Sequence, residues 1–186
     1  GIVPYLGVAG FFAAIILAEK NLSIAAIIMI VTFIMLFVAG GRIQDLFGKV
    51  APVLLVVVSI FIFGEGYRRA RMLNFLNPWK DPAGDGYQLI QSFYALGAGG
   101  LTGLGLGQSR QKTLYMPEPH NDFIFSIIGE ELGLIGCLFI VGLFIFFVIR
   151  GVRTAFKAKD TYGTLLAVGI TSIIAVQAII NIAVVT

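Results

Sequence analysis

The sequence predicts an all-α polytopic membrane protein with about five transmembrane helices and a long extracytoplasmic loop that contains an interfacial helix. Of the 186 residues, 58% are apolar and 12% are charged, and the mean hydropathy is +0.95. Soluble domains contain about 45 to 50% apolar and about 25% charged residues. The bilayer is therefore the main solvent of this chain. Its 23 glycines agree with that conclusion, because glycine is more frequent in membrane helices than in soluble ones.

Five charge-poor segments are candidates for the transmembrane helices. Each approaches the roughly 20 apolar residues that span the hydrocarbon core of a bilayer. They are residues 1–18, 22–41, 46–64, 132–149 and 162–186. Only Glu19-Lys20-Asn21 separates the first two, which predicts a helical hairpin. The third is long enough because the side chain of Lys49 can extend to the interface.

The chain divides into three regions of one larger membrane domain. Residues 1–64 hold three transmembrane helices, residues 65–122 form the extracytoplasmic loop with its interfacial helix, and residues 123–186 hold two more transmembrane helices. The chain starts without Met and stops inside an apolar run. We therefore expect it to be part of a longer protein, in which five helices are a lower bound.

The short connections between helices predict the orientation. Cytoplasmic connections carry an excess of Lys and Arg. The basic residues of the two connections are Arg42 and Lys49 in one, and Arg150, Arg153, Lys157 and Lys159 in the other. Both connections lie on the cytoplasmic side if residues 65–122 do not cross the bilayer. The pI near 9.1 does not indicate a nucleic-acid partner, because most basic residues flank apolar runs instead of forming one patch.

Within the loop, an apolar stretch has the spacing of a short helix. Its residues at helical spacing are Tyr87, Ile90, Phe93, Tyr94 and Gly97. Six glycines between Gly97 and Gly107 argue against continuation as a sixth span. We expect an interfacial helix followed by a glycine-rich turn. A flap that only shields other groups from solvent is the alternative.

The charged residues of the loop form two clusters, one on each side of this helix. The first contains Arg68, Arg69 and Arg71, and the second contains Arg110, Lys112, Glu118, His120 and Asp122. Basic residues near a helix end ordinarily anchor lipid headgroups. Their concentration on the outer side, where few are expected, favours the binding of an anion such as pyrophosphate.

Asp122 is the candidate with the most specific chemistry. A straight helix from residue 149 back through 132 would place it roughly 12 Å or more beyond the hydrocarbon boundary at about 1.5 Å per residue. A carboxylate near the first turn of a helix usually caps that helix, and this placement favours its ionised form. An ionised Asp can also act as a general base toward an attacking hydroxyl. The residues alone leave both roles open.

Glu118 and His120 lie just before this position. They could orient a substrate or help to hold a divalent cation such as Mg²⁺ or Mn²⁺. Two carboxylates and one His at this spacing match no fixed ligand pattern, and a surface hydrogen-bonding role for His120 is the simpler alternative. Cys137, the single Cys, lies in an apolar run and is expected to pack as a small apolar side chain.

An ordered series of motifs resembles the SEDS family of bacterial shape, elongation, division and sporulation proteins, and the FtsW and SpoVE branch more than RodA. The motifs are Tyr67-Arg68 with Arg71, Asn77-Pro78-Trp79-Lys80-Asp81-Pro82, Gly86-Tyr87-Gln88, Gln91-Ser92, Gly103-Leu104-Gly105-Leu106-Gly107-Gln108-Ser109, Gln111-Lys112, Pro117-Glu118 with His120, Asp122-Phe123-Ile124-Phe125 and Glu130-Glu131-Leu132-Gly133. The resemblance covers essentially the whole chain. One departure is Glu19-Lys20-Asn21-Leu22-Ser23, where many members have Gln-Pro-Asp-Leu-Gly, so no role for an acid is carried over to Asn21.

The resemblance implies a ten-helix glycosyltransferase of the bacterial cell membrane. Such a protein polymerises lipid II, an undecaprenyl-linked precursor, into glycan strands beside a cognate class B penicillin-binding protein. By similarity, Asp122 is the catalytic residue, and Arg68, Arg71 and Lys112 contact the substrate. Two other classes stay open: a flippase that moves the lipid-linked precursor without forming a bond, and a non-catalytic scaffold for the penicillin-binding protein.

Overall fold

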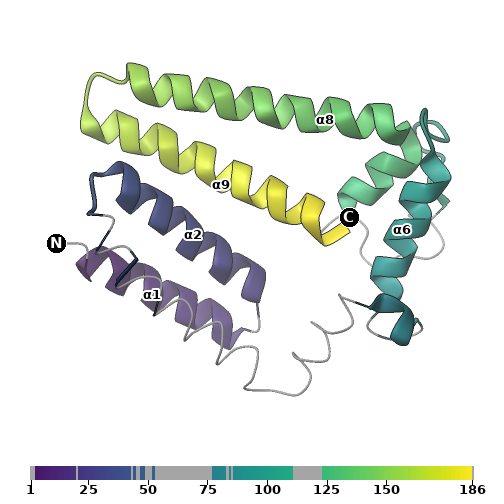
Figure 1. The fold of residues 1–186 in the computed structure, drawn as a ribbon, viewed down its shortest axis with the longest axis horizontal. Helices are drawn as coiled ribbons and strands as arrows, with labels where there is room; N and C mark the ends of the chain where they lie inside the picture. Colours follow the sequence, from purple (N-terminus) through teal and green to yellow (C-terminus); the bar gives the residue numbers. More distant parts are fainter. Residues whose placement is uncertain are drawn as a thin grey trace. The chain divides into compact units, whose positions relative to one another are not determined.

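The regular structure of the described part of the chain is helical. The computed structural model describes residues 3–19, 21–42, 44, 47–48, 52, 77–82, 84, 86–110 and 123–185. Its elements are α1 (Val3–Ala18), α2 (Leu22–Val38), the 3₁₀ helix η2 (Pro78–Lys80), α6 (Tyr87–Gly99), α8 (Ile124–Lys157) and α9 (Thr161–Val185) (Figure 1). The predicted all-α class is confirmed for these residues.

Helices α1 and α2 form the predicted hairpin. The turn between them ends at Asn21, whose side-chain oxygen accepts a hydrogen bond of 3.2 Å from the backbone N–H of Ile24. This bond satisfies one of the amides that a helix leaves unpaired at its start. The buried positions include Ala9 and Ala13 on α1 and Ala25 on α2. Small side chains at such positions let membrane helices approach closely.

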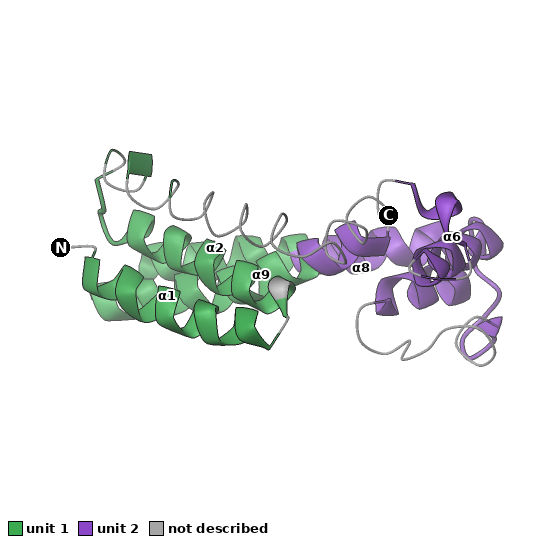
Figure 2. Ribbon diagram, turned by 90° about the horizontal axis from the view of Figure 1, so that it is seen from below, with its two compact units in different colours: residues 1–60, 145–178 green, residues 61–144, 179–186 purple. Residues whose placement is uncertain are grey.

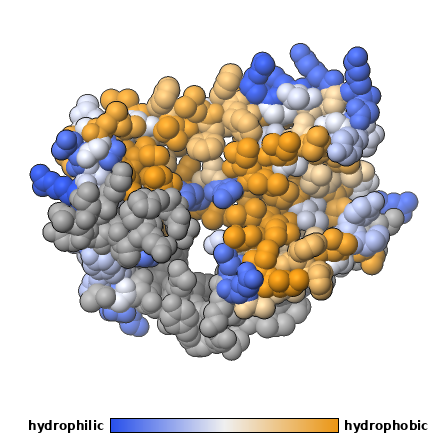
Figure 3. All heavy atoms as spheres, turned by 180° about the vertical axis from the view of Figure 1, so that it is seen from behind, coloured by the Kyte–Doolittle hydropathy of each residue, from blue (hydrophilic) through white to orange (hydrophobic). Residues whose placement is uncertain are grey.

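Four of the described helices are apolar, and two of them are long enough to span a bilayer. The two long ones are α8 and α9, and the two shorter ones cover Val3–Ala18 and Ser23–Val38. Phe139 on α8 is 65% exposed and Ile179 on α9 is 65% exposed. Much of the visible surface in Figure 3 is hydrophobic. Lipid is the solvent that suits such a surface, so the prediction of a membrane protein is supported by these helices.

The chain contains two compact units (Figure 2). The first unit consists of Gly1–Ile60 and Ile145–Ala178, and the second consists of Phe61–Phe144 and Ile179–Thr186. The predicted regions 1–64, 65–122 and 123–186 refer to topology, and they stay a prediction. Nearly all of the predicted third span, residues 46–64, lies outside the described residues.

A helix lies where the sequence predicts an interfacial one. It is α6, and positive φ angles follow it at Gly100, Gly103, Gly105 and Gly107, as expected of a glycine-rich turn. The buried residues of α6 are Leu89, Ile90, Ser92, Ala95 and Gly99, so Ile90 is buried among the five residues at the predicted spacing, whereas Tyr94 and Gly97 are exposed. Tyr94 is exposed and lies edge-on to Trp79 of η2. Whether α6 lies in the outer interface stays a prediction.

Candidate functional site

All six predicted site residues lie outside the described residues. They are Asp122, Arg68, Arg71, Lys112, Glu118 and His120. Their roles therefore stay predictions. Four of them belong to residues 111–122, and the structure describes the chain on both sides of that segment. The described residues next to this segment are those up to Arg110 and those from Phe123 onward, and both belong to the second unit.

Helix α8 is broken at Gly133. This residue has φ 67° and ψ −168°, which lies outside the helical region. The prediction of one straight helix from residue 149 back toward Asp122 is wrong. The depth of Asp122 stays a prediction, because Asp122 lies outside the described residues. Figure 1 shows that the part of α8 before the break runs in a different direction from the part after it. The apolar stretch after the break contains most of the predicted span 132–149.

The glycine-rich turn after α6 pairs with the backbone of α8 at this break. Four hydrogen bonds connect them: from Leu104 N to Glu130 O at 2.9 Å, from Gly105 N to Glu131 O at 3.0 Å, from Leu134 N to Gly100 O at 2.9 Å, and from Ile135 N to Leu101 O at 3.2 Å. A helix break leaves amides and carbonyls without helical partners. Unpaired amides and carbonyls are costly away from water, and the turn supplies the hydrogen-bond partners that α8 lacks at its break.

Glycines make this close contact possible. A Cβ atom at Gly99 would overlap the carbonyl oxygen of Gly129, and one at Gly103 would overlap the backbone at Glu131. A Cβ at Gly133 would lie 2.6 Å from the carbonyl carbon of Leu101. The backbones of the turn and α8 thus touch directly, with no room for side chains between them.

Glu130 fixes the chain just before residues 111–122. Its side chain is 1% exposed. The hydroxyl of Ser109 donates to its Oε2 at 2.5 Å, and the backbone N–H of Arg110 donates to its Oε1 at 3.0 Å. The sequence indicated Glu130 only as part of a family motif at the membrane boundary. No signal within the sequence pairs it with Ser109, which lies 21 residues earlier.

Apolar packing fixes the chain just after the same segment. Phe123 is buried in a cluster with Phe125, Cys137 and Val185. The backbone carbonyl of Phe123 also accepts a 2.7 Å hydrogen bond from the hydroxyl of Ser126. Cys137 therefore packs as a small apolar side chain, as predicted. Residues 111–122 begin and end next to anchored positions.

No metal centre occurs among the residues that the structure describes. Within them, no group of three or more His, Cys, Asp or Glu side chains could hold an ion. Glu118 and His120, the predicted helpers of a divalent cation, lie outside this part of the chain. The cation stays a prediction.

Comparison with known proteins decides the family. The sequence model described as "Cell cycle protein", for the family of FtsW, RodA and SpoVE, matches residues 1–186. The chain belongs to this family. The resemblance of its ordered motifs to the SEDS proteins is thereby confirmed, and with it the polytopic membrane class.

Curated relatives in this FtsW, RodA and SpoVE family align over the whole chain. A protein named probable peptidoglycan glycosyltransferase FtsW from Geobacter sp. (strain M18) is 42% identical over 186 residues, which cover 100% of this chain and 50% of that protein. Stage V sporulation protein E from Bacillus subtilis (strain 168) is 46% identical over 191 residues, and the alignment covers 100% of this chain and 50% of that protein. A protein named probable peptidoglycan glycosyltransferase FtsW from Trichlorobacter lovleyi is 45% identical over 186 residues, and the alignment covers 100% of this chain and 49% of that protein. The chain spans about half the length of these relatives.

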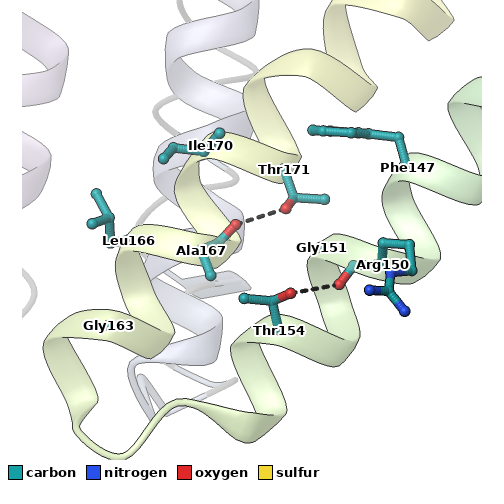
Figure 4. A pocket seen from close by; sticks show the side chains of 9 residues that line it. All are labelled: Phe147, Arg150, Gly151, Thr154, Gly163, Leu166, Ala167, Ile170 and Thr171. Carbon is teal, nitrogen blue, oxygen red and sulfur yellow. Dashed lines mark hydrogen bonds between the residues drawn. The ribbon is translucent and has the colours of Figure 1, made fainter.

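A hollow lies within the first unit, between α8 and α9. It has a volume of about 460 Å³ and is lined by Phe147, Arg150, Gly151, Thr154, Gly163, Leu166, Ala167, Ile170 and Thr171 (Figure 4). The hydroxyls of Thr154 and Thr171 donate to carbonyls of their own helices, those of Arg150 at 2.9 Å and Ala167 at 2.7 Å. The lining is thus mainly apolar, and it includes none of the predicted site residues.

Gly151 is expected to set the spacing of α8 and α9 beside this hollow. A Cβ there would overlap Thr171 Oγ1, whereas a Cβ at Gly142 on the same helix meets no described atom within 4 Å. Both Gly→Ala changes gain about 1 kcal/mol of helix propensity. Relative to Gly142→Ala, we expect Gly151→Ala to lose about 1 to 3 kcal/mol through overpacking. Thermal unfolding of the full-length protein in detergent measures the difference, and equal unfolding temperatures would contradict the prediction.

Proposed function

We propose that the full-length protein is a peptidoglycan glycosyltransferase of the bacterial cell membrane that polymerises lipid II into glycan strands. The match of the family to all 186 residues carries this proposal. It includes the segment with Asp122 and the regions on both sides. The relatives that align over the whole chain are named peptidoglycan glycosyltransferase or stage V sporulation protein. Division, sporulation or shape is the process that such polymer serves.

In the proposed reaction, Asp122 acts as the general base. It removes the proton from the sugar 4-hydroxyl of an incoming lipid II as the hydroxyl oxygen attacks the anomeric carbon of the growing chain. The new carbon–oxygen bond forms while the bond to undecaprenyl pyrophosphate breaks, and the leaving group takes the electron pair. A single displacement of this kind inverts the configuration at the anomeric carbon.

Basic residues of the same loop are proposed to stabilise the leaving group. Arg68, Arg71 and Lys112 would neutralise the negative charge that develops on the pyrophosphate. Glu118 and His120 would orient the substrate or help to hold a Mg²⁺ or Mn²⁺ ion, and no step of the proposed reaction depends on that ion. This assignment requires the loop to face the extracytoplasmic side, where the positive-inside rule places it.

The described structure supports an enzyme whose reactive segment is held at both ends. Ser109 and Arg110 are bonded to Glu130, and Phe123 is packed against α8. Effective general-base catalysis needs the base within hydrogen-bond reach of its substrate. Anchoring both ends of the segment reduces the number of conformations that it can adopt, so less entropy is lost when the base reaches this geometry.

A polymerisation assay tests the function directly. Purified full-length protein, alone and with its cognate class B penicillin-binding protein, is incubated with labelled lipid II in vesicles, and both polymer and transbilayer movement are measured. We expect polymer to form, with the partner raising the rate. Movement of lipid II without polymer would support the flippase. Neither activity, together with normal assembly of the complex, would support the scaffold.

A further inference from the structure

Glu130 occupies an unusual position for a charged residue type. At 1% exposure it is the largest of the side chains that are fully buried within the described residues. Glu is almost never fully buried unless its polar atoms are paired, because the loss of hydration is costly. Both of its carboxyl oxygens do accept hydrogen bonds, one from Ser109 and one from Arg110. With both oxygens engaged and only 1% of its surface exposed, this side chain is not placed to touch a substrate.

The partners of Glu130 make it a connection between two distant stretches of chain. Ser109 and Arg110 precede it by 21 and 20 residues. Its backbone carbonyl also accepts the 2.9 Å bond from Leu104 of the glycine-rich turn. The backbone of Glu130 thus holds the glycine-rich turn, and its side chain holds Ser109 and Arg110, which follow that turn. The side-chain bonds hold the last two described residues before residues 111–122.

These contacts determine how residues 111–122 are tethered. Arg110, at one end, is hydrogen-bonded to the side chain of Glu130, and Phe123, at the other end, is buried against α8. Both tethers lie on the first turns of α8 or pack against them. Release of one tether lengthens the stretch between the two anchored positions and increases the conformations available to it.

We propose that Glu130 is a positioning residue, whose carboxyl group holds Ser109 and Arg110 so that the segment with Lys112 and Asp122 keeps its catalytic geometry. The role of this segment rests on the proposed function. The proposal assigns Glu130 no contact with substrate. It acts by anchoring Ser109 and Arg110, so its replacement lowers the rate of the chemical step.

The anchoring is tested by hydrogen exchange, which needs no activity. Full-length protein in nanodiscs is compared with Glu130→Gln, Glu130→Ala and Ser109→Ala variants, with Glu19→Gln as the matched control in the exposed turn after α1. Loss of one hydrogen bond corresponds to about a tenfold change in an opening equilibrium. Because Glu130→Ala removes two such bonds, we expect peptides from 109–123 to exchange about 100-fold faster in this variant, while peptides from 161–178 of α9 are unchanged.

The positioning role is tested by steady-state polymerisation kinetics on the same proteins. Misplacement of a catalytic group by about 1 Å can cost about 100-fold in rate. We expect kcat to fall about 100-fold in Glu130→Ala with little change in KM, and less in Glu130→Gln, whose amide oxygen still accepts one hydrogen bond. Ser109→Ala and Glu130→Ala should not be additive when combined, because both remove the hydrogen bond between Ser109 and Glu130. Glu19→Gln should match the unsubstituted protein.

Each outcome decides the proposal. Unchanged exchange in 109–123 overturns the anchor, and faster exchange with an unchanged kcat overturns the positioning role. If Glu130→Ala fails to insert, Glu130→Gln and Ser109→Ala supply the same two measurements. If the unsubstituted protein forms no polymer, the proposed function fails, and with it the catalytic half of this proposal, whereas the exchange result still decides the anchor.

Discussion

Replacement of Asp122 with Asn is expected to abolish glycan polymerisation while leaving the protein folded and inserted. Asn has nearly the same shape as Asp, but its amide cannot accept the proton of the attacking hydroxyl. General-base catalysis contributes about 100- to 10,000-fold to a rate, so we expect a loss of that size. The measurement is the rate of polymer formation from labelled lipid II by the full-length protein with its partner synthase.

The same substitution separates the two roles that the residues leave open. Asn caps a helix about as well as Asp does. A helix-capping Asp122 would therefore tolerate the change, whereas a general base would not. Asp160 supplies a matched control, because its carboxylate accepts a 3.0 Å hydrogen bond from Gly163 N at the start of α9. Asp160→Asn should keep full activity. An Asp122→Asn variant that polymerises at the normal rate would end the assignment of Asp122 as the base.

Replacement of Gly133 with Ala is expected to prevent folding of the α6–α8 region. The backbone angles of Gly133 lie in a region that is essentially restricted to glycine, where strain costs about 1 to 3 kcal/mol. Its Cβ would also lie 2.6 Å from the carbonyl carbon of Leu101. Relief of that overlap would separate the glycine-rich turn from α8 and break their four backbone hydrogen bonds. We expect a total loss above about 4 kcal/mol, which is a large part of the stability of a typical protein.

Two other glycines separate the causes of this effect. Gly100 has φ 52° with no described atom within 4 Å of an added Cβ, so Gly100→Ala tests backbone strain alone. Gly142→Ala, inside α8 with free space around it, tests helix propensity alone. Folded yield in membranes and thermal unfolding should fall in the order Gly142→Ala, Gly100→Ala, Gly133→Ala. Equal behaviour of Gly133→Ala and Gly142→Ala would show that the break is not required.

Several elements could be predicted because their signals are local. The three-residue polar break before Leu22 separates two apolar runs, and it is the hairpin turn of α1 and α2. The glycines after Gly97 end α6, and positive φ angles follow it. The charge-free run after residue 161 is α9. Composition and spacing suffice to locate such helices, because apolar side chains are stable in the bilayer at any position along a span.

The candidate site was only partly predictable. The motifs indicated Asp122 and its basic neighbours, and the family match supports the enzyme class they imply. They did not indicate that Glu130 holds Ser109 and Arg110, because a hydrogen bond across 21 residues leaves no periodic trace in a sequence. Adjacent acids beside an apolar run look like boundary residues, and only burial distinguishes Glu130 from that alternative.

The sequence by itself determined that this chain is a helical membrane protein and where its hairpin, α6 and α9 lie, and it predicts that residues 65–122 carry the candidate chemistry. Those properties follow from hydropathy, charge and glycine content, which act over neighbouring residues. Only the tertiary structure decided that α8 breaks at Gly133 and that the turn after α6 completes it. Glycine is common within membrane helices, so its presence cannot show a break. The break is set by the backbone groups of Gly100 to Gly105, which replace the hydrogen bonds that α8 lacks there.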